Sequence, residues 1–154
     1  MQRRDALRTG ISALSLSGLW AAGVLLPEAL FAAWPSAAFE ADDLQTAQRL
    51  FFGETVAETS DQIVITAPDV AENGRVVPVE VAIRLPEPTT LTLFSDGNPS
   101  PLLARARFTP AVESRLALRV KLGQSSNLIA LVEADGKLYR QSRAVKVTAG
   151  GCGS

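Results

Sequence analysis

Apolar residues occupy every second position over residues 77–85, with polar or small residues between them. The same two-residue period returns over residues 116–122, and at Val145 and Val147 near the end of a further predicted strand, residues 138–147. Because alternate side chains of a β-strand point to opposite faces, this pattern predicts strands with one buried face. Shorter apolar segments predict further strands at residues 63–65, 91–94, 104–108 and 128–133. The last of these is a continuous apolar run, which is typical of a central strand.

Turn-forming residues separate the predicted strands. Asn73-Gly74 and Asp135-Gly136 are dipeptides favoured in tight turns, and residues 86–88 and 96–101 are rich in proline, glycine and polar residues. About seven short strands with turns between them predict an all-β fold, an immunoglobulin-like β-sandwich. The cysteine pair and core tryptophan of antibody domains are absent.

The segment 39–52 has a different period and predicts a short helix before the first strand. Asp42 or Asp43 is suited to cap its N-terminus, and Gly53 is suited to end it. The apolar residues that recur at helical spacing are Leu44, Ala47, Leu50 and Phe51. We interpret this stripe as the face that packs on the sheet.

Residues 1–33 have the pattern of an export signal. A twin-arginine pair, Arg3-Arg4, precedes a moderately apolar run over residues 11–26, and small residues follow. The run is shorter than the ~20 residues of a membrane-spanning helix. We therefore predict a removable twin-arginine signal and a periplasmic mature chain with no membrane attachment. An uncleaved N-terminal anchor is the alternative.

The composition excludes several classes of function. The chain has no histidine and one cysteine, so it lacks the usual catalytic base, an ordinary Cys/His metal site and a disulfide within the chain. A net charge of −1 and 6% aromatic residues argue against nucleic-acid binding. We expect no catalytic residues, no metal and no cofactor.

The single cysteine, Cys152, is flanked by Gly150, Gly151 and Gly153. Glycine adopts backbone conformations of either sign of φ, and it has no side chain to pack. Residues 149–154 are therefore expected to form a flexible arm that presents an exposed thiol.

The arm begins where the sandwich domain, residues 34–148, is expected to end. If Val147 is the last strand residue, Cys152 lies five positions beyond it. An extended chain spans at most 3.3–3.6 Å per residue, so the thiol can reach about 16–18 Å beyond the sheet. This reach is sufficient to enter a pocket on another protein.

We interpret Cys152 as the attachment point for a covalently carried group. An unperturbed thiol is mostly protonated at neutral pH, and no cation adjacent in sequence favours the thiolate. Attachment and release of the group are therefore expected to be catalysed by partner proteins. Three alternatives stay open at this point. The first is a disulfide between Cys152 and another chain, and the second is a cysteine with no specific role. The third is lipid attachment, although Cys152 is not at the mature N-terminus and lacks the C-a-a-X pattern of prenylation.

The chain resembles the SoxY family, the sulfur-carrier subunits of the bacterial thiosulfate-oxidising Sox system. The tail Gly150-Gly151-Cys152-Gly153-Ser154 is similar to the family's Gly-Gly-Cys-Gly-Gly ending, with serine in place of the last glycine. Other similar stretches are residues 33–35, 38–41, 67–74, 76–79, 98–102, 134–137 and 145–148.

The resemblance implies an immunoglobulin-like carrier that is not itself an enzyme. It implies that Cys152 carries sulfur intermediates in the periplasm and that the chain forms a heterodimer with a SoxZ-like subunit. It also implies transient contacts with SoxXA, which conjugates thiosulfate to the thiol, with SoxB, which releases sulfate, and in some organisms with SoxCD. A homodimer linked through Cys152 in the absence of a partner is a further expectation.

Overall fold

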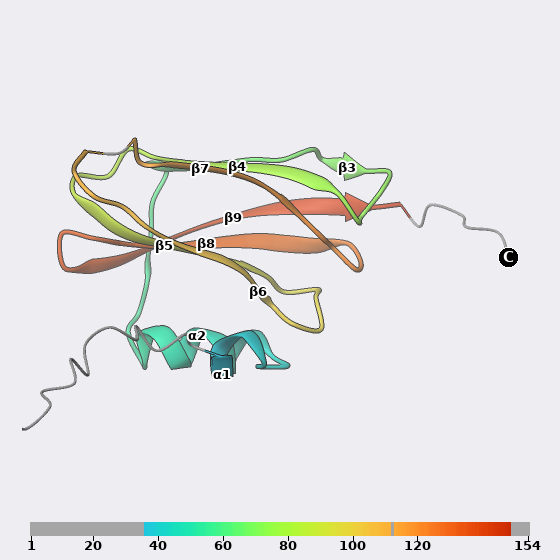
Figure 1. Cartoon of the computed structure of the whole chain (residues 1–154), viewed down its shortest axis with the longest axis horizontal. Coiled ribbons are helices and arrows are strands. Elements are labelled where there is room, and N and C mark those ends of the chain that lie inside the picture. The colour runs from blue at the N-terminus through green and yellow to red at the C-terminus, as the bar shows by residue number, and fades with distance from the viewer. Residues whose placement is uncertain (1–35, 112, 149–154) are drawn as a thin grey trace, which may run out of the picture. The chain divides into compact units, whose positions relative to one another are not determined.

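A computed structural model describes residues 36–111 and 113–148. Two β-sheets face each other, and two short helices cover the outer face of the larger sheet (Figure 1). The predicted all-β sandwich is therefore confirmed. The predicted export signal, residues 1–33, lies outside the described residues and stays a prediction.

The larger sheet has six strands. Its order is β1-β9-β8-β5-β6, and β3 also pairs with β9. The strands of this sheet are β1 (Glu58–Thr59), β3 (Val70–Ala71), β5 (Pro88–Ser95), β6 (Leu102–Arg107), β8 (Ser126–Ala134) and β9 (Lys137–Val147). The smaller sheet has the order β2-β4-β7, with β2 (Ile63–Thr66), β4 (Val77–Ile83) and β7 (Arg115–Val120).

The two-residue period of the sequence matches the burial of the strands. In β4, Val77, Val79, Val81 and Ile83 are buried between the sheets. The apolar run of β8 is buried on both faces, because the strand lies between β5 and β9 and is covered by the second sheet and by the helices. This burial explains why β8 lacks alternation.

The two turn dipeptides have different roles. Asp135 and Gly136 have φ values of 48° and 68° and join β8 to β9, as expected for a two-residue hairpin. Asn73-Gly74 also forms a turn, in which the Asn73 side-chain oxygen accepts the N–H of Arg75 at 2.9 Å. This second turn connects β3 in one sheet to β4 in the other.

The structure has two short helices where the sequence predicted one helix over residues 39–52. Helix α1 (Ser36–Phe39) and helix α2 (Leu44–Phe52) are separate. Asp43 has an extended backbone and its carboxylate accepts the N–H of Thr46 at 2.8 Å, so a continuous helix cannot pass through it. The predicted end is confirmed, since Gly53, at φ 60°, follows the last turn and its N–H donates to Arg49.

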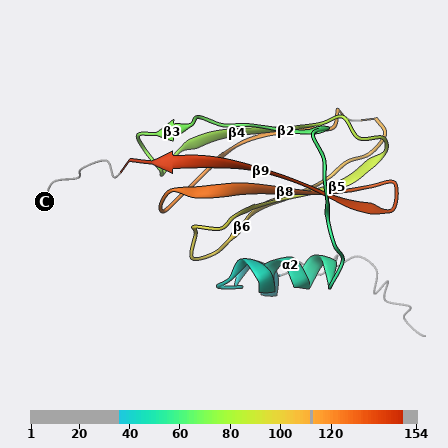
Figure 2. The same cartoon turned by 180° about the vertical axis from the view of Figure 1, so that it is seen from behind.

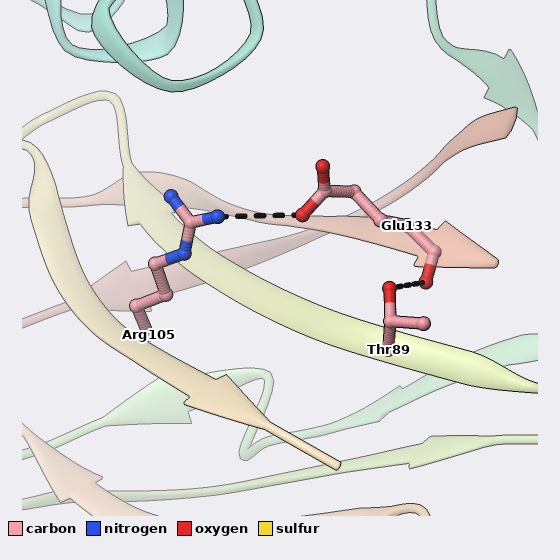
Figure 3. Close-up of polar contacts among 3 residues, drawn as sticks. All are labelled: Thr89, Arg105 and Glu133. Carbon is pink, nitrogen blue, oxygen red and sulfur yellow. Dashed lines mark hydrogen bonds and ion pairs between the residues drawn. The ribbon is translucent and has the colours of Figure 1, made fainter. Parts of the chain in front are cut away.

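Helix α2 packs on the outer face of the larger sheet (Figure 2). The guanidinium of Arg105, on β6, lies 4.3 Å from the ring centre of Phe51. The same group pairs with Glu133 of β8 at 3.3 Å (Figure 3). Partial burial under the helix lowers the pKa of Arg105, and the Glu133 carboxylate opposes that shift.

Candidate functional site

The predicted site residues lie outside the described part of the chain. These are the attachment residue Cys152 and the glycines of the predicted arm, Gly150, Gly151 and Gly153. Thr148 is the last described residue before them. The structure therefore locates the point from which the predicted arm begins.

One side of this point is held by β3. Strand β3 pairs in parallel with the end of β9, with Val70 opposite Lys146. The N–H of Lys146 donates to Asp69 at 2.9 Å, and the N–H of Thr148 donates to Ala71 at 3.1 Å. The short strand therefore extends backbone pairing to the last described residue.

The other side is held by the loop between β7 and β8. The hydroxyl oxygen of Ser125 accepts the N–H of Val147 at 2.9 Å. Gly74 lies beside Val147, because a β-carbon on Gly74 would be 2.9 Å from a methyl group of Val147. The end of β9 is thus held between two segments that are distant from it in sequence: β3 with the turn that follows it, and the loop before β8. It has a fixed place at one end of the sandwich (Figure 1).

A cavity of about 550 Å³ lies at the same end of the molecule. The N–H of Leu122 donates to Gly74 at 2.7 Å, which connects the loop beside the cavity to the turn beside Val147. The cavity lies between the 96–101 loop, β6 and the end of β7. Its lining residues are Asn98, Pro99, Ser100, Leu102, Leu103, Arg119, Val120, Lys121 and Gly123.

Most polar groups around the cavity already have partners. Asn98 donates to Lys121 at 2.8 Å and accepts from Gly123 at 2.9 Å, and the Ser100 hydroxyl donates to Phe39 at 2.7 Å. Arg119 and Lys121 are exposed and form no ion pair with any described residue. The cavity therefore combines apolar walls with two cationic side chains.

The sequence did not predict this cavity. Residues 96–101 were predicted as a loop, and Arg119 and Lys121 as the outward side of a strand. The loop is confirmed and both side chains are exposed, but β7 ends at Val120, so Lys121 lies just after the strand. Neither prediction shows that the loop lies against the end of β7. Among the described residues, no three acidic side chains converge closely enough to hold a metal ion. No helix in this part is long and apolar enough to cross a membrane.

Comparisons with known proteins identify the family. The model of the family "Sulfur oxidation protein SoxY" matches residues 47–152, which include Cys152. A search of curated protein sequences finds no match. The solved structure of the sulfur carrier protein SoxY from Chlorobium limicola f thiosulfatophilum is similar, with 39% identity and a TM-score of 0.64, and the match covers 75% of this chain and 100% of that one.

A more distant structural similarity concerns the fold alone. The superoxide reductase (neelaredoxin) from Ignicoccus hospitalis has 23% identity and a TM-score of 0.54, and the match covers 63% of this chain and 98% of that one. The SoxY family model spans more than half of the chain, and the similar carrier structure is matched over its full length. The chain belongs to the SoxY family of sulfur oxidation proteins.

Proposed function

We propose that the chain is a covalent carrier of sulfur intermediates, attached to Cys152, during thiosulfate oxidation in the periplasm. The observation that carries this proposal is the extent of the family match, which reaches residue 152, together with the absence of any other cysteine in the chain. Cys152 is therefore the one residue of this chain that can form the covalent bond to sulfur expected of a carrier in this family.

The chemistry that this role requires can be written with atoms and electrons balanced. In the first step, the Cys152 thiol and thiosulfate form a cysteine S-thiosulfonate, releasing one proton and two electrons to a c-type cytochrome. In the second, water attacks the terminal sulfonate sulfur, so that sulfate and one proton leave and a cysteine persulfide stays. In a third step, the persulfide loses six electrons to a c-type cytochrome and takes three oxygen atoms from water, releasing seven protons and leaving a cysteine S-sulfonate. Hydrolysis of this group by a further water releases sulfate and one proton and regenerates the thiol.

We propose that partner proteins perform these steps. The candidates are SoxXA for conjugation, SoxB for hydrolysis and, where present, SoxCD for oxidation of the persulfide. We also propose that a SoxZ-like subunit forms a stable heterodimer with this chain. The chain supplies the thiol and its support, since it has no histidine and its one cysteine is the attachment residue itself.

The described structure supports the proposal of an arm by the way in which it holds the chain just before the arm begins. The end of β9 is held by backbone bonds to β3 and by Ser125. Beyond it, three of the five residues 150–154 are glycine, and Cys152 lies among them. A fixed origin followed by glycines suits a thiol that must enter several different active sites, because only the arm has to change conformation.

The experiment is replacement of Cys152 by serine in the producing organism. Thiosulfate consumption and sulfate formation should be lost, while the amount of exported protein stays unchanged. The matched control is Ser154→Gly, which restores the tail usual in the family and should leave both rates unaltered. Undiminished sulfate formation in Cys152→Ser would overturn the proposal. A Cys152-linked dimer on non-reducing gels, with no sulfur adduct, would favour the disulfide alternative.

A further inference from the structure

Strand β7 forms one edge of the smaller sheet. Within the described part of the chain it pairs only with β4. The N–H of Ile83, at the end of β4, donates to Ser114 at 2.9 Å. Because hydrogen-bonded and non-bonded pairs alternate in an antiparallel ladder, the backbone groups of Arg115, Ala117 and Arg119 point away from β4. The N–H of Arg115 already donates to the Glu113 carbonyl at 2.8 Å. The backbone groups of Ala117 and Arg119 therefore form the open edge that another strand can extend.

The inward face beside this edge is apolar and only partly closed. Leu116 and Leu118 of β7 are half-buried against the core, and so are Leu103 and Phe108 at the β6 side of the other sheet. Residues from β6 and β7 line the same cavity, so the two strands lie near each other across the sandwich. Apolar side chains of an added strand would cover this opening.

The outward face of the same strand is basic. Arg115 and Arg119 are both exposed, and Lys121 follows on the same side. Arg115 is paired with Glu80 at 2.7 Å, and this carboxylate raises the pKa of the guanidinium. Arg119 and Lys121 have no ion pair with a described residue. Acidic residues placed opposite them on an added strand would therefore be stabilising.

A second copy of this chain does not fit the edge. Antiparallel pairing of β7 with itself, centred on Ala117, places Arg115 of each copy opposite Arg119 of the other. Like charges directly opposite each other on neighbouring strands are destabilising. The edge therefore disfavours self-pairing and favours a strand of opposite charge.

We propose that the edge of β7 binds an extended strand of a different protein, in which apolar and acidic residues alternate. The strand adds to the smaller sheet through backbone hydrogen bonds at Ala117 and Arg119. Its apolar residues cover Leu116 and Leu118, and its acidic residues lie beside Arg119 and Lys121. The proposal does not depend on sulfur chemistry at Cys152, so the two can fail separately.

The test uses the exported, isotopically labelled chain and a synthetic peptide of alternating glutamate and valine with blocked ends. Amide resonances of β7 should shift on titration, and hydrogen exchange at Ala117 and Arg119 should slow. A matched peptide with lysine in place of glutamate should not bind at the same concentrations. In the double variant Arg119→Glu/Lys121→Glu, affinity for the glutamate peptide should fall by about tenfold and the lysine peptide should become the better ligand.

Three results would overturn the proposal. The first is absence of binding, or shifts confined to strands other than β7. The second is equal binding of the glutamate and lysine peptides. The third is undiminished binding of a glutamate peptide methylated on alternate backbone nitrogens along the edge facing β7, because strand addition requires those N–H groups. Unchanged amide shifts in the buried core show that the double variant is folded.

Discussion

Gly74 and Leu122 approach each other so closely that a β-carbon at position 74 would overlap the backbone of Leu122. The N–H of Leu122 donates to the Gly74 carbonyl at 2.7 Å, and a β-carbon on Gly74 would be 2.3 Å from the carbonyl oxygen of Leu122. Val147, at the end of β9, lies against the same glycine. The turn after β3, the loop after β7 and the end of β9, from which the proposed arm begins, therefore meet at Gly74.

We predict that Gly74→Ala is destabilising. The added methyl group meets backbone atoms that cannot move without separating the two segments, so the free energy of unfolding should fall by about 1–3 kcal/mol. The matched control is Gly123→Ala, where the nearest atom would be 3.8 Å from the new β-carbon and the change should be small. Urea unfolding of both variants measures the difference, and equal stability would contradict the proposed close contact.

Asp43 should make stability depend on pH at acidic values. The hydrogen bond from Thr46 lowers the pKa of this carboxyl below its ordinary value of 3.8. A lowered pKa in the folded state means that the cap stabilises the protein fully above pH 3.8 and that this contribution is lost as the pH falls through the folded-state value. Asp43→Ala should therefore have a lower melting temperature at neutral pH, with a smaller difference below pH 3.8.

Asp43→Asn is the control for that prediction. Asparagine also caps helices but does not titrate. This variant should keep most of the stability at neutral pH, and its stability should vary less with pH in the acidic range. A melting temperature of Asp43→Ala equal to that of the native chain at neutral pH would show that the cap contributes nothing.

Phe51 should contribute more to stability than its neighbour Leu50. Phe51 packs on the larger sheet beneath Arg105, whereas Leu50 is 52% exposed. Phe→Ala in a full core costs about 3–5 kcal/mol, so we expect about 2 kcal/mol for the half-buried Phe51 and little for Leu50→Ala. Chemical unfolding of both variants distinguishes them, and equal costs would mean that α2 does not pack on the sheet as described.

Strand β4 was predictable because its burial is one-sided, and β8 because its apolar run is buried on both faces. In β4 the buried apolar residues alternate with Pro78, Glu80 and Ala82, because one face of the strand packs in the core. Strands β1 and β3 have two residues each, which is too short for any period, so they were missed. Their positions depend on pairing with β9, more than 70 residues later in the chain.

The turn at Asn73-Gly74 shows a second limit. The dipeptide indicated a turn, but whether it connects neighbouring strands or two sheets depends on contacts with Leu122 and Val147. The same applies to Asn98, whose partners Lys121 and Gly123 are more than 20 residues away. The cavity between these segments is a product of the tertiary fold, so local sequence patterns could not indicate it.

The most direct test of the sulfur-carrier role is the intact mass of the exported chain, purified without reductant during active thiosulfate oxidation. We predict adducts with the mass of sulfane sulfur or of a thiosulfate group, located on the peptide that contains Cys152 and removed by reductant. The Cys152→Ser chain should have none of them. An unmodified thiol throughout active thiosulfate oxidation would contradict the account.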